Sequence, residues 1–231
     1  MFFPIKDTVR ARSFPLVNWL LIAANVVVFL YEAHLSQPAL LRFVAHYGLV
    51  PARLWAHPST AWPTLLTSMF LHGGWFHVLS NVWVLYIFGD NVEDRMGSGR
   101  YLVFYLLSGL AAGLVQATVL PTSTVPTVGA SGAIAGVLGA YMLFYPSGRV
   151  VTLVTLFFFV TFMEIPAVLF LGLWFVAQLY SGWLSLLPHA THALGGVAWW
   201  AHIGGFTFGL LMAKFFAQRD YRVYPDEFYP W

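Results

Sequence analysis

The chain contains no cysteine, and only 9% of its 231 residues are Asp, Glu, Lys or Arg. Without cysteine it can form no disulfide, no thiolate nucleophile and no cysteine-ligated zinc site. Soluble domains carry about 25% charged residues, so the low charge excludes an ordinary soluble domain. The formal net charge of +2 indicates no acidic partner, and no basic stripe interleaved with aromatic residues indicates nucleic acid.

Apolar sequence is what the chain has in abundance: 59% of its residues are hydrophobic and the mean hydropathy is +0.74. Several apolar runs approach the length of about 20 residues that a helix needs to cross the hydrocarbon core. We therefore expect an all-α polytopic membrane protein whose main partner is the lipid bilayer. Residues 1–13 and 217–231 are expected to be short terminal segments.

The apolar runs predict six spans. They cover Pro15–Tyr31, Leu65–Phe88, Tyr101–Leu120, Ala130–Tyr145, Pro166–Trp183 and Ala198–Phe216. The second is interrupted at His72-Gly73-Gly74, and the fourth is short, so Ser131 is expected inside the bilayer. The connector Glu32–Pro63 is expected to contain a short interfacial helix. We expect Gly89–Arg100, where charge is densest, to be a loop.

The stretch 150–183 allows two interpretations. Either Pro166–Trp183 is one span and Val151–Phe162 packs at the cytoplasmic side, or the stretch holds two spans and the chain has seven. Basic residues favour cytoplasmic loops. Six spans place nine of the eleven Lys and Arg residues in the cytoplasm, whereas seven spans place six there. Six spans with both termini cytoplasmic is the better prediction, and such a compact chain fits a prokaryotic inner membrane.

The first span follows Lys6, Arg10 and Arg12, an arrangement that also opens signal peptides. The apolar run is long, however, and no cleavage site of small residues follows it. We interpret it as a retained span.

A hydroxyl stands among small residues in Val128–Ala140. Ser131, Ala135 and Gly139 share one helical face, so another backbone can approach the hydroxyl closely. Taken alone, this segment is more typical of a helix-packing seam than of a catalytic site.

Three further polar residues lie within predicted spans, where such residues are often functional. Gly205 and Gly209 follow His202 by three and seven positions and lie near the same face of the predicted helix. This small-residue face could pack on the serine helix, and His202 would then be a candidate general base for Ser131. His77 and Asn81 are four residues apart and can both donate hydrogen bonds, either to an oxyanion or to a neighbouring helix.

Metal binding is the competing use of the histidines. His72 and His77 are five residues apart rather than four, and His189 and His192 lie in a loop without a carboxylate. No H-E-x-x-H motif is present, so no metal and no other cofactor is expected. Glu164 is the only carboxylate near the membrane interior and is expected to lie far from Ser131, which leaves a Ser–His dyad without a third member.

Together these residues resemble the rhomboid family of intramembrane serine proteases. The motifs occur in the family's order: His77-x-x-x-Asn81, Glu93-x-Arg95-x-Gly97, Gly129-x-Ser131-Gly132 and Ala201-His202-x-x-Gly205-x-x-x-Gly209. The likeness extends over nearly the whole chain and implies one rhomboid-like membrane domain over residues 1–231. We give the Glu93 motif a structural role.

The resemblance implies cleavage of a peptide bond in or beside a transmembrane helix of a substrate protein. Ser131 would be the nucleophile and His202 the base, and His77, Asn81, Ser131 and Gly132 would form the oxyanion hole. By the same resemblance, aromatic residues of the fifth span could line the lateral access for substrate; the alternative, which we favour, is that they are ordinary aromatics facing lipid. These residues are Phe170, Trp174 and Trp183.

Two departures from the family pattern bear on these expectations. The Trp-Arg pair of the first connector is absent, and Ala135 stands where some members carry an aromatic that supports the histidine. Two other classes compete with the protease: a catalytically silent relative that binds membrane clients, and a small-molecule transporter or channel. Retention of Ser131 and His202 argues against the first, and the lack of an internal repeat argues against the second.

Overall fold

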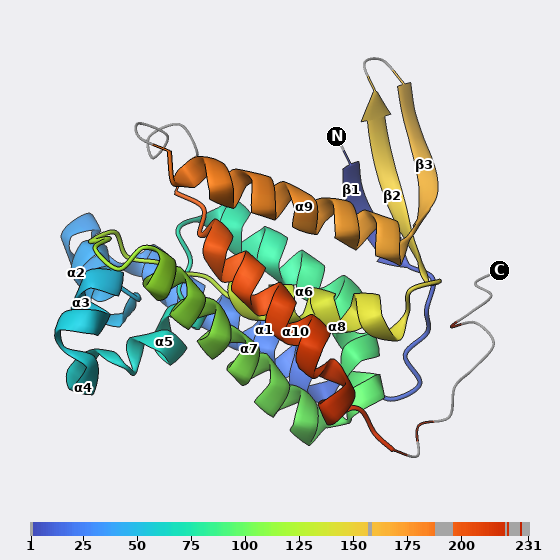
Figure 1. Cartoon of the computed structure of the whole chain (residues 1–231), viewed down its shortest axis with the longest axis horizontal. Coiled ribbons are helices and arrows are strands. Elements are labelled where there is room, and N and C mark those ends of the chain that lie inside the picture. The colour runs from blue at the N-terminus through green and yellow to red at the C-terminus, as the bar shows by residue number, and fades with distance from the viewer. Residues whose placement is uncertain (1, 157–158, 188–195, 220, 222–226, 228–231) are drawn as a thin grey trace.

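The computed structural model describes residues 2–156, 159–187, 196–219, 221 and 227 (Figure 1). In this part of the chain, long helices form a bundle with a small antiparallel sheet at one end. The long helices are α1 (Leu16–His34), α6 (Trp75–Met96), α7 (Ser98–Val119), α8 (Ser131–Phe144), α9 (Ala167–Ser185) and α10 (Trp199–Phe216). The strands are β1 (Phe2–Asp7), β2 (Arg149–Leu156) and β3 (Phe159–Pro166).

Helix α8 lies at the centre of the bundle, against α6, α7 and α10 (Figure 1). All residues from Gly132 to Tyr141 are buried. A helix that is apolar around its whole circumference can be stable in this position because neighbours cover every side. The helix that begins at Ser131 is therefore the core of the molecule.

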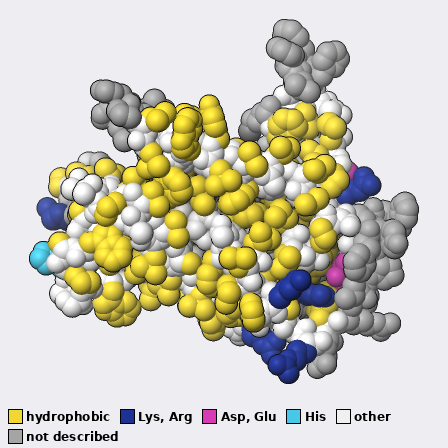
Figure 2. All heavy atoms as spheres, viewed as in Figure 1, with side chains coloured by type: hydrophobic (Ala, Val, Ile, Leu, Met, Phe, Trp, Pro, Cys, Tyr) yellow, Lys and Arg dark blue, Asp and Glu magenta, His cyan; other side chains and the backbone are white. Residues whose placement is uncertain are grey.

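The outer surface is apolar over much of its area. Figure 2 shows hydrophobic side chains across the face that α7, α9 and α10 present, while most visible Lys and Arg side chains lie toward the end where α10 terminates. Among the described residues, α1, α7 and α9 are long and apolar enough to cross a membrane, and α8 is apolar but shorter. This surface is typical of an integral membrane protein.

The stretch 150–183 contains one helix and a hairpin rather than two helices. Strands β2 and β3 pair antiparallel, with Val150 opposite Ile165, and β1 pairs with the other edge of β2, with Phe2 opposite Val154. The interpretation with two spans is therefore wrong. The residues of β2 are mostly β-branched, which favours a pleated strand over a helix.

The predicted loop Gly89–Arg100 is also wrong, because α6 continues to Met96 and α7 begins at Ser98. Only Gly97 separates them, at a φ of 79° that glycine adopts without strain. Glu93 is buried and accepts hydrogen bonds from the backbone N–H groups of Val17 and Asn18, at 3.0 and 2.7 Å. It thereby satisfies free donors in the first turn of α1, which explains why a charge remains inside a helix.

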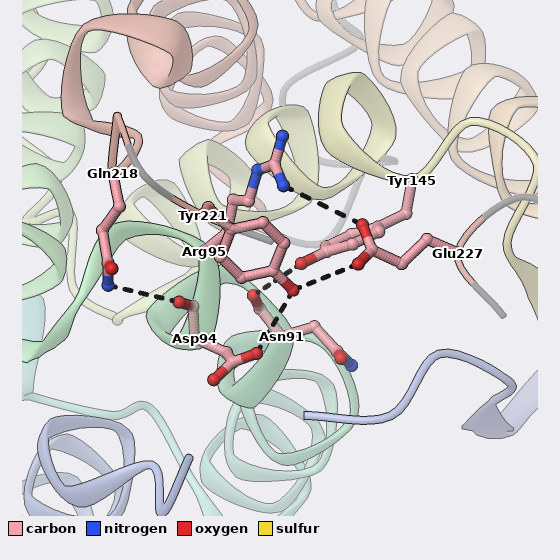
Figure 3. Close-up of polar contacts among 7 residues, drawn as sticks. All are labelled: Asn91, Asp94, Arg95, Tyr145, Gln218, Tyr221 and Glu227. Carbon is pink, nitrogen blue, oxygen red and sulfur yellow. Dashed lines mark hydrogen bonds and ion pairs between the residues drawn. The ribbon is translucent and has the colours of Figure 1, made fainter. Parts of the chain in front are cut away.

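Arg95 lies at the centre of a second polar cluster at this end (Figure 3). Its guanidinium stacks over the ring of Tyr221 at 4.1 Å, and one nitrogen lies 3.9 Å from a carboxylate oxygen of Glu227. The backbone N–H of Gln218 donates to the carbonyl oxygen of Arg95 at 3.0 Å. The motif around Glu93 and Arg95 thus makes structural contacts to both ends of the chain.

The first connector folds without the Trp-Arg pair of the family pattern. It contains α2 (Gln37–Tyr47), α3 (Pro51–Ala56) and α4 (Pro58–Ala61), so the expected short helix is present. The predicted second span begins later than expected: α5 (Thr64–Thr67) and the 3₁₀ turn η1 (Ser68–Phe70) occupy its first residues, and the long helix starts only at Trp75. Arg53 donates to the carbonyl oxygens of Ala45, His46 and Gly48, which ends α2. Trp55 donates from Nε1 to the carbonyl oxygen of Ala117 at 2.8 Å and attaches the connector to α7.

Asp7, at the end of β1, connects the sheet to the central helix. Its Oδ2 accepts from Tyr141 of α8 at 2.5 Å and from Asn91 of α6 at 2.8 Å. Loss of hydration, reinforced by the nearby Asp90 carboxyl, raises the pKa of Asp7 from its usual value of 3.8 to about 8, although the Tyr141 hydrogen bond opposes this. Below pH 8 the folded protein therefore favours the neutral acid.

We predict that Asp7→Asn raises the apparent melting temperature at pH 8 and leaves it nearly unchanged near pH 4. Between the usual pKa of 3.8 and the folded pKa of about 8, the unfolded chain ionises and the folded chain resists ionisation, so stability falls as pH rises through this interval. The asparagine oxygen can still accept both hydrogen bonds but carries no charge. Thermal unfolding in detergent at the two pH values tests this; a lower melting temperature of the variant at pH 8 would contradict it.

Candidate active site

Ser131 is the first residue of α8, and the preceding loop controls how the helix begins. Gly129 has a φ of 126°, which favours glycine, and its N–H donates to the carbonyl oxygen of Ser68 at 2.9 Å. A methyl group added to Gly129 would lie 2.7 Å from His77 and 3.6 Å from the Ser131 hydroxyl oxygen. The missing side chain therefore lets the ring of His77 approach the serine end of α8.

His202 of α10 lies directly against the serine. Its Nε2 is 2.8 Å from the Ser131 Oγ, and its Nδ1 is 2.8 Å from the Oε1 of Gln178 on α9. The other end of the Gln178 amide donates from Nε2 to the carbonyl oxygen of Trp174 at 3.3 Å, so the amide oxygen faces the ring. An amide oxygen can only accept, so Nδ1 carries the proton and Nε2 accepts from the serine hydroxyl.

The two helices meet through glycine at backbone contact. A methyl group added to Gly205 would lie 1.9 Å from the carbonyl oxygen of Gly132, and one added to Gly209 would lie 2.0 Å from that of Gly136. From the other side, a methyl group added to Gly139 would lie 2.4 Å from the carbonyl oxygen of Phe206. The small-residue face predicted for each helix therefore packs on the other. The packing seam and the serine–histidine contact are parts of one arrangement.

Aromatic rings near His202 come from helices other than α8. Ala135 is fully buried, and the rings of Trp174 and Trp199 lie 5.9 and 6.3 Å from the imidazole between centroids. Trp174 is thus directed to the histidine, whereas Trp183 is 57% exposed. The aromatic that the family pattern places one turn after the serine has a counterpart on α9.

His77 and Asn81 stand on one face in the first two turns of α6. The Nδ1 of His77 accepts from the N–H of Gly73 at 3.3 Å, so Nε2 carries the proton and lies on the side of Gly129. Asn81 is 7% exposed, and its Nδ2 is a buried donor that has no partner among the residues the structure describes. Most buried donors in proteins are paired, so an unpaired one beside a candidate site needs an explanation.

The amino end of α8 adds backbone donors. The first hydrogen bond of the helix runs from Ile134 N–H to the carbonyl oxygen of Ala130. The N–H groups of Ser131, Gly132 and Ala133 come before it and therefore have no acceptor within the helix. A small cavity adjoins Ser131, with Ser68, Met69 and Ala198 among its lining residues. The serine therefore lies at the positive end of a helix dipole and next to free space.

No carboxylate or metal cluster contacts the serine and histidine within the part of the chain that the structure describes. No three His, Asp or Glu side chains there are close enough to hold a metal ion. The expected loop histidines, His189 and His192, lie outside the described residues. Glu164 is in β3 at the far end of α9, where its carboxylate is 3.9 Å from the guanidinium of Arg149.

Gln178 is a residue of the site that was not predicted from the sequence. Only a carboxylate was considered as a group that could orient the histidine. The available signal was a single amide within an apolar run, in line with the rule that polar residues inside membrane helices have partners.

A Rhomboid domain family model matches residues 59–219 of the chain. The chain is 41% identical over 87 residues to Rhomboid-like protein 11, chloroplastic, of Arabidopsis thaliana, covering 38% of this chain and 31% of that protein. It is 29% identical over 195 residues to the human presenilin-associated rhomboid-like protein, mitochondrial, and this match covers 82% of this chain and 45% of that protein. It is 40% identical over 88 residues to the rhomboid protease GluP of Bacillus subtilis, and this match covers 38% of this chain and 17% of that protein. The matches thus span less than half of each of these relatives.

We predict that Gly209→Ala separates α8 from α10 and lowers stability by about 1–3 kcal/mol or more, because the added methyl group meets backbone rather than a movable side chain. Gly172→Ala on α9 is the matched control, since nothing lies within 4 Å of its added methyl group. Melting temperatures of the two variants in detergent test the prediction. Equal stability of both variants and the wild type would show that the seam tolerates a wider spacing.

Proposed function

Because the chain belongs to the rhomboid family, we propose that it is an intramembrane serine endopeptidase that cleaves peptide bonds in or beside transmembrane helices of other membrane proteins. The observation that carries the proposal is the 2.8 Å contact between Ser131 Oγ and His202 Nε2 in an apolar surrounding. A serine hydroxyl is a weak nucleophile, and an adjacent histidine with a free lone pair activates it. The proposed reaction needs no metal and no other cofactor.

The proposed reaction proceeds through an acyl-enzyme. His202 Nε2 takes the Ser131 proton while Oγ attacks the substrate carbonyl carbon. The protonated imidazole then gives this proton to the leaving amine, and the peptide bond breaks. A water molecule deprotonated by His202 attacks the ester, and its hydrolysis returns the serine hydroxyl. The neutral tautomer of His202 supports the transfers in which it acts as a base, since Nε2 must be unprotonated before it takes the proton of Ser131 or of water.

The donors around Ser131 form the proposed oxyanion hole. His77 contributes Nε2–H, Asn81 contributes its unpaired Nδ2–H, and Ser131 and Gly132 contribute backbone N–H groups at the start of α8. Preorganised donors stabilise the charge that develops on the carbonyl oxygen, and they act most strongly where water is excluded. An unpaired buried amide is what such a site requires before the substrate is bound.

We propose that six helices, α1 and α6 to α10, cross the bilayer. Ser13 donates to the Asp94 carboxylate and Gln218 donates to the Arg95 carbonyl oxygen, so the chain enters α1 and leaves α10 at the same end of the molecule. This arrangement supports an even number of crossings. Helix α8 has 14 residues and is about 21 Å long, shorter than the hydrocarbon core of about 30 Å, so Ser131 would lie within the bilayer.

The orientation and the membrane are part of the proposal. Six crossings with cytoplasmic termini place most basic residues in the cytoplasm, in keeping with the positive-inside rule. Location in a prokaryotic inner membrane stays a prediction, since relatives include proteins named as mitochondrial and chloroplastic. The proposed partners are substrate proteins with a transmembrane helix.

We predict that Ser131→Ala and His202→Ala abolish covalent labelling by a fluorophosphonate probe. In this reaction Oγ forms a bond to phosphorus, fluoride leaves and His202 accepts the proton, so both side chains are required. In-gel fluorescence of purified protein in detergent measures the label, with melting temperatures to show that the variants are folded. Cleavage of a single-span substrate should be lost in parallel.

Full labelling of either variant would exclude the dyad. If the wild type takes no label while a fluorophosphonate-reactive rhomboid does so under the same conditions, the protein would instead be a catalytically silent relative that binds membrane clients.

We predict that Asn81→Ala slows substrate cleavage by about 10²- to 10³-fold, the usual effect of losing one oxyanion donor. The residual rate should exceed that of Ser131→Ala, because the donors of His77 and the α8 backbone remain. Time courses of cleavage at saturating substrate measure the effect. Loss as complete as that of the serine variant would show that Asn81 has a role other than that of one donor among several.

A further inference from the structure

Gln178 is the side chain of α9 that reaches the proposed catalytic pair. We infer that Gln178 is a positioning residue that holds His202 in its reactive tautomer and orientation, in the place where a carboxylate stands in a Ser-His-Asp triad. The inference rests on the proposed function. Its evidence is the 2.8 Å contact between the Gln178 Oε1 and the His202 Nδ1, and the 6% exposure of Gln178.

The amide is itself held in one orientation. Its Nε2 donates to the carbonyl oxygen of Trp174, one turn earlier on α9. Reversal of the amide would break this bond and would place two N–H donors against the imidazole. The observed orientation therefore presents an acceptor to Nδ1, and the ring keeps its second nitrogen free for Ser131.

Gln178 belongs to the buried face of α9, which packs against α10. The buried residues of this helix are Ala167, Leu171, Gln178 and Gly182, which recur at intervals of four, seven and four and form one narrow stripe. At Gly182 the stripe meets Ile203 and Trp200 of α10. Since α9 is otherwise largely exposed, the amide lies in the seam through which the helix docks on α10.

A neutral amide suits this location better than a carboxylate. An ionised acid within an apolar helix bundle loses its hydration, and a single hydrogen bond compensates for this only in part. The amide supplies the acceptor that selects the tautomer without that loss. It provides less stabilisation of the imidazolium that forms during the reaction, because it carries no charge.

The charge environment of His202 leaves the effect of Gln178 measurable. Among the described residues, the polar side chains that face the histidine region from neighbouring helices are Gln178 on α9, Ser131 on α8 and Gln116 on α7, which accepts from Ala201 N–H at 3.1 Å. The ring of Trp174 on α9 is an apolar neighbour, and within the same part of the chain His77 on α6 is the titratable group that acts on His202 electrostatically. A change at residue 178 therefore alters the nearest partner of Nδ1 and leaves the other titratable group in place.

The test is the rate of fluorophosphonate labelling as a function of pH for three variants. Gln178→Leu removes the acceptor, and we expect labelling to slow by about tenfold and the pH of half-maximal labelling to fall. Gln178→Glu restores an acceptor and adds charge, so labelling at high pH should recover and the half-maximal pH should rise by about one unit. Leu171→Ala is the matched control, because it weakens the same stripe without touching the imidazole.

The inference is supported if the two variants of Gln178 move the half-maximal pH in opposite directions while Leu171→Ala leaves it at the wild-type value. It is overturned if Gln178→Leu is labelled at the wild-type rate and pH, or if Gln178→Glu is no faster than Gln178→Leu at any pH. It is also overturned if Leu171→Ala, matched in melting temperature, shifts the profile equally. In each of these cases labelling of the wild type still supports the dyad, whereas absence of wild-type labelling counts against the proposed function itself.

Discussion

The close approach of two helix backbones is the constraint on which the rest of the structure depends. Helices in lipid associate through van der Waals packing, and that packing is strongest where no side chain separates the backbones. Here α8 and α10 both contribute glycine, so the carbonyl oxygen of Gly132 lies where a methyl group of residue 205 would be. The 2.8 Å contact between Ser131 and His202 lies at the end of this seam. A larger spacing would separate the two side chains before it affected either helix.

Polar groups in the interior mostly connect one element to another. Glu93 accepts from the start of α1, and Asn18 bonds both to Tyr101 and to the carbonyl oxygen of Leu85. Several buried polar atoms have no partner among the described residues, including the Asn81 Nδ2, the Ser108 Oγ and the Glu32 Oε1. Each such atom destabilises the resting protein. Absence of a partner therefore does not by itself distinguish a reactive group from a structural one; what distinguishes Asn81 is its place on the same face of α6 as His77, whose ring lies against Gly129.

From the sequence, Ser131 and His202 could be assigned to small-residue helix faces that the structure brings into contact, whereas less of their surroundings could be predicted. Hydropathy located the helices, and the small-residue faces of α8 and α10 correctly indicated close packing. The segment from Val151 to Phe162 was not recognised as part of a hairpin, because a short apolar run does not by itself distinguish a strand from a helix segment. The third strand could not be foreseen either, since β2 pairs with residues 2–7 across more than 140 positions. The length of α6 was missed because Glu93 looks like a loop residue until its partner on α1 is known. Gln178 was missed for the same reason: its significance depends on a helix 24 residues away.

The sheet and the site are mechanically related through α9. The first N–H of this helix, that of Ala167, donates to the carbonyl oxygen of Gly148 at 2.7 Å. The amino-terminal end of α9 is therefore held to the turn that follows α8. Gln178 lies eleven residues further, or about 16 Å along the axis. A swing of α9 by about 10° around the held end would move Gln178 by roughly 3 Å, which is more than a hydrogen bond tolerates. The orientation of His202 and the position of α9 therefore cannot change independently, and any movement of this helix away from α10 also releases the imidazole.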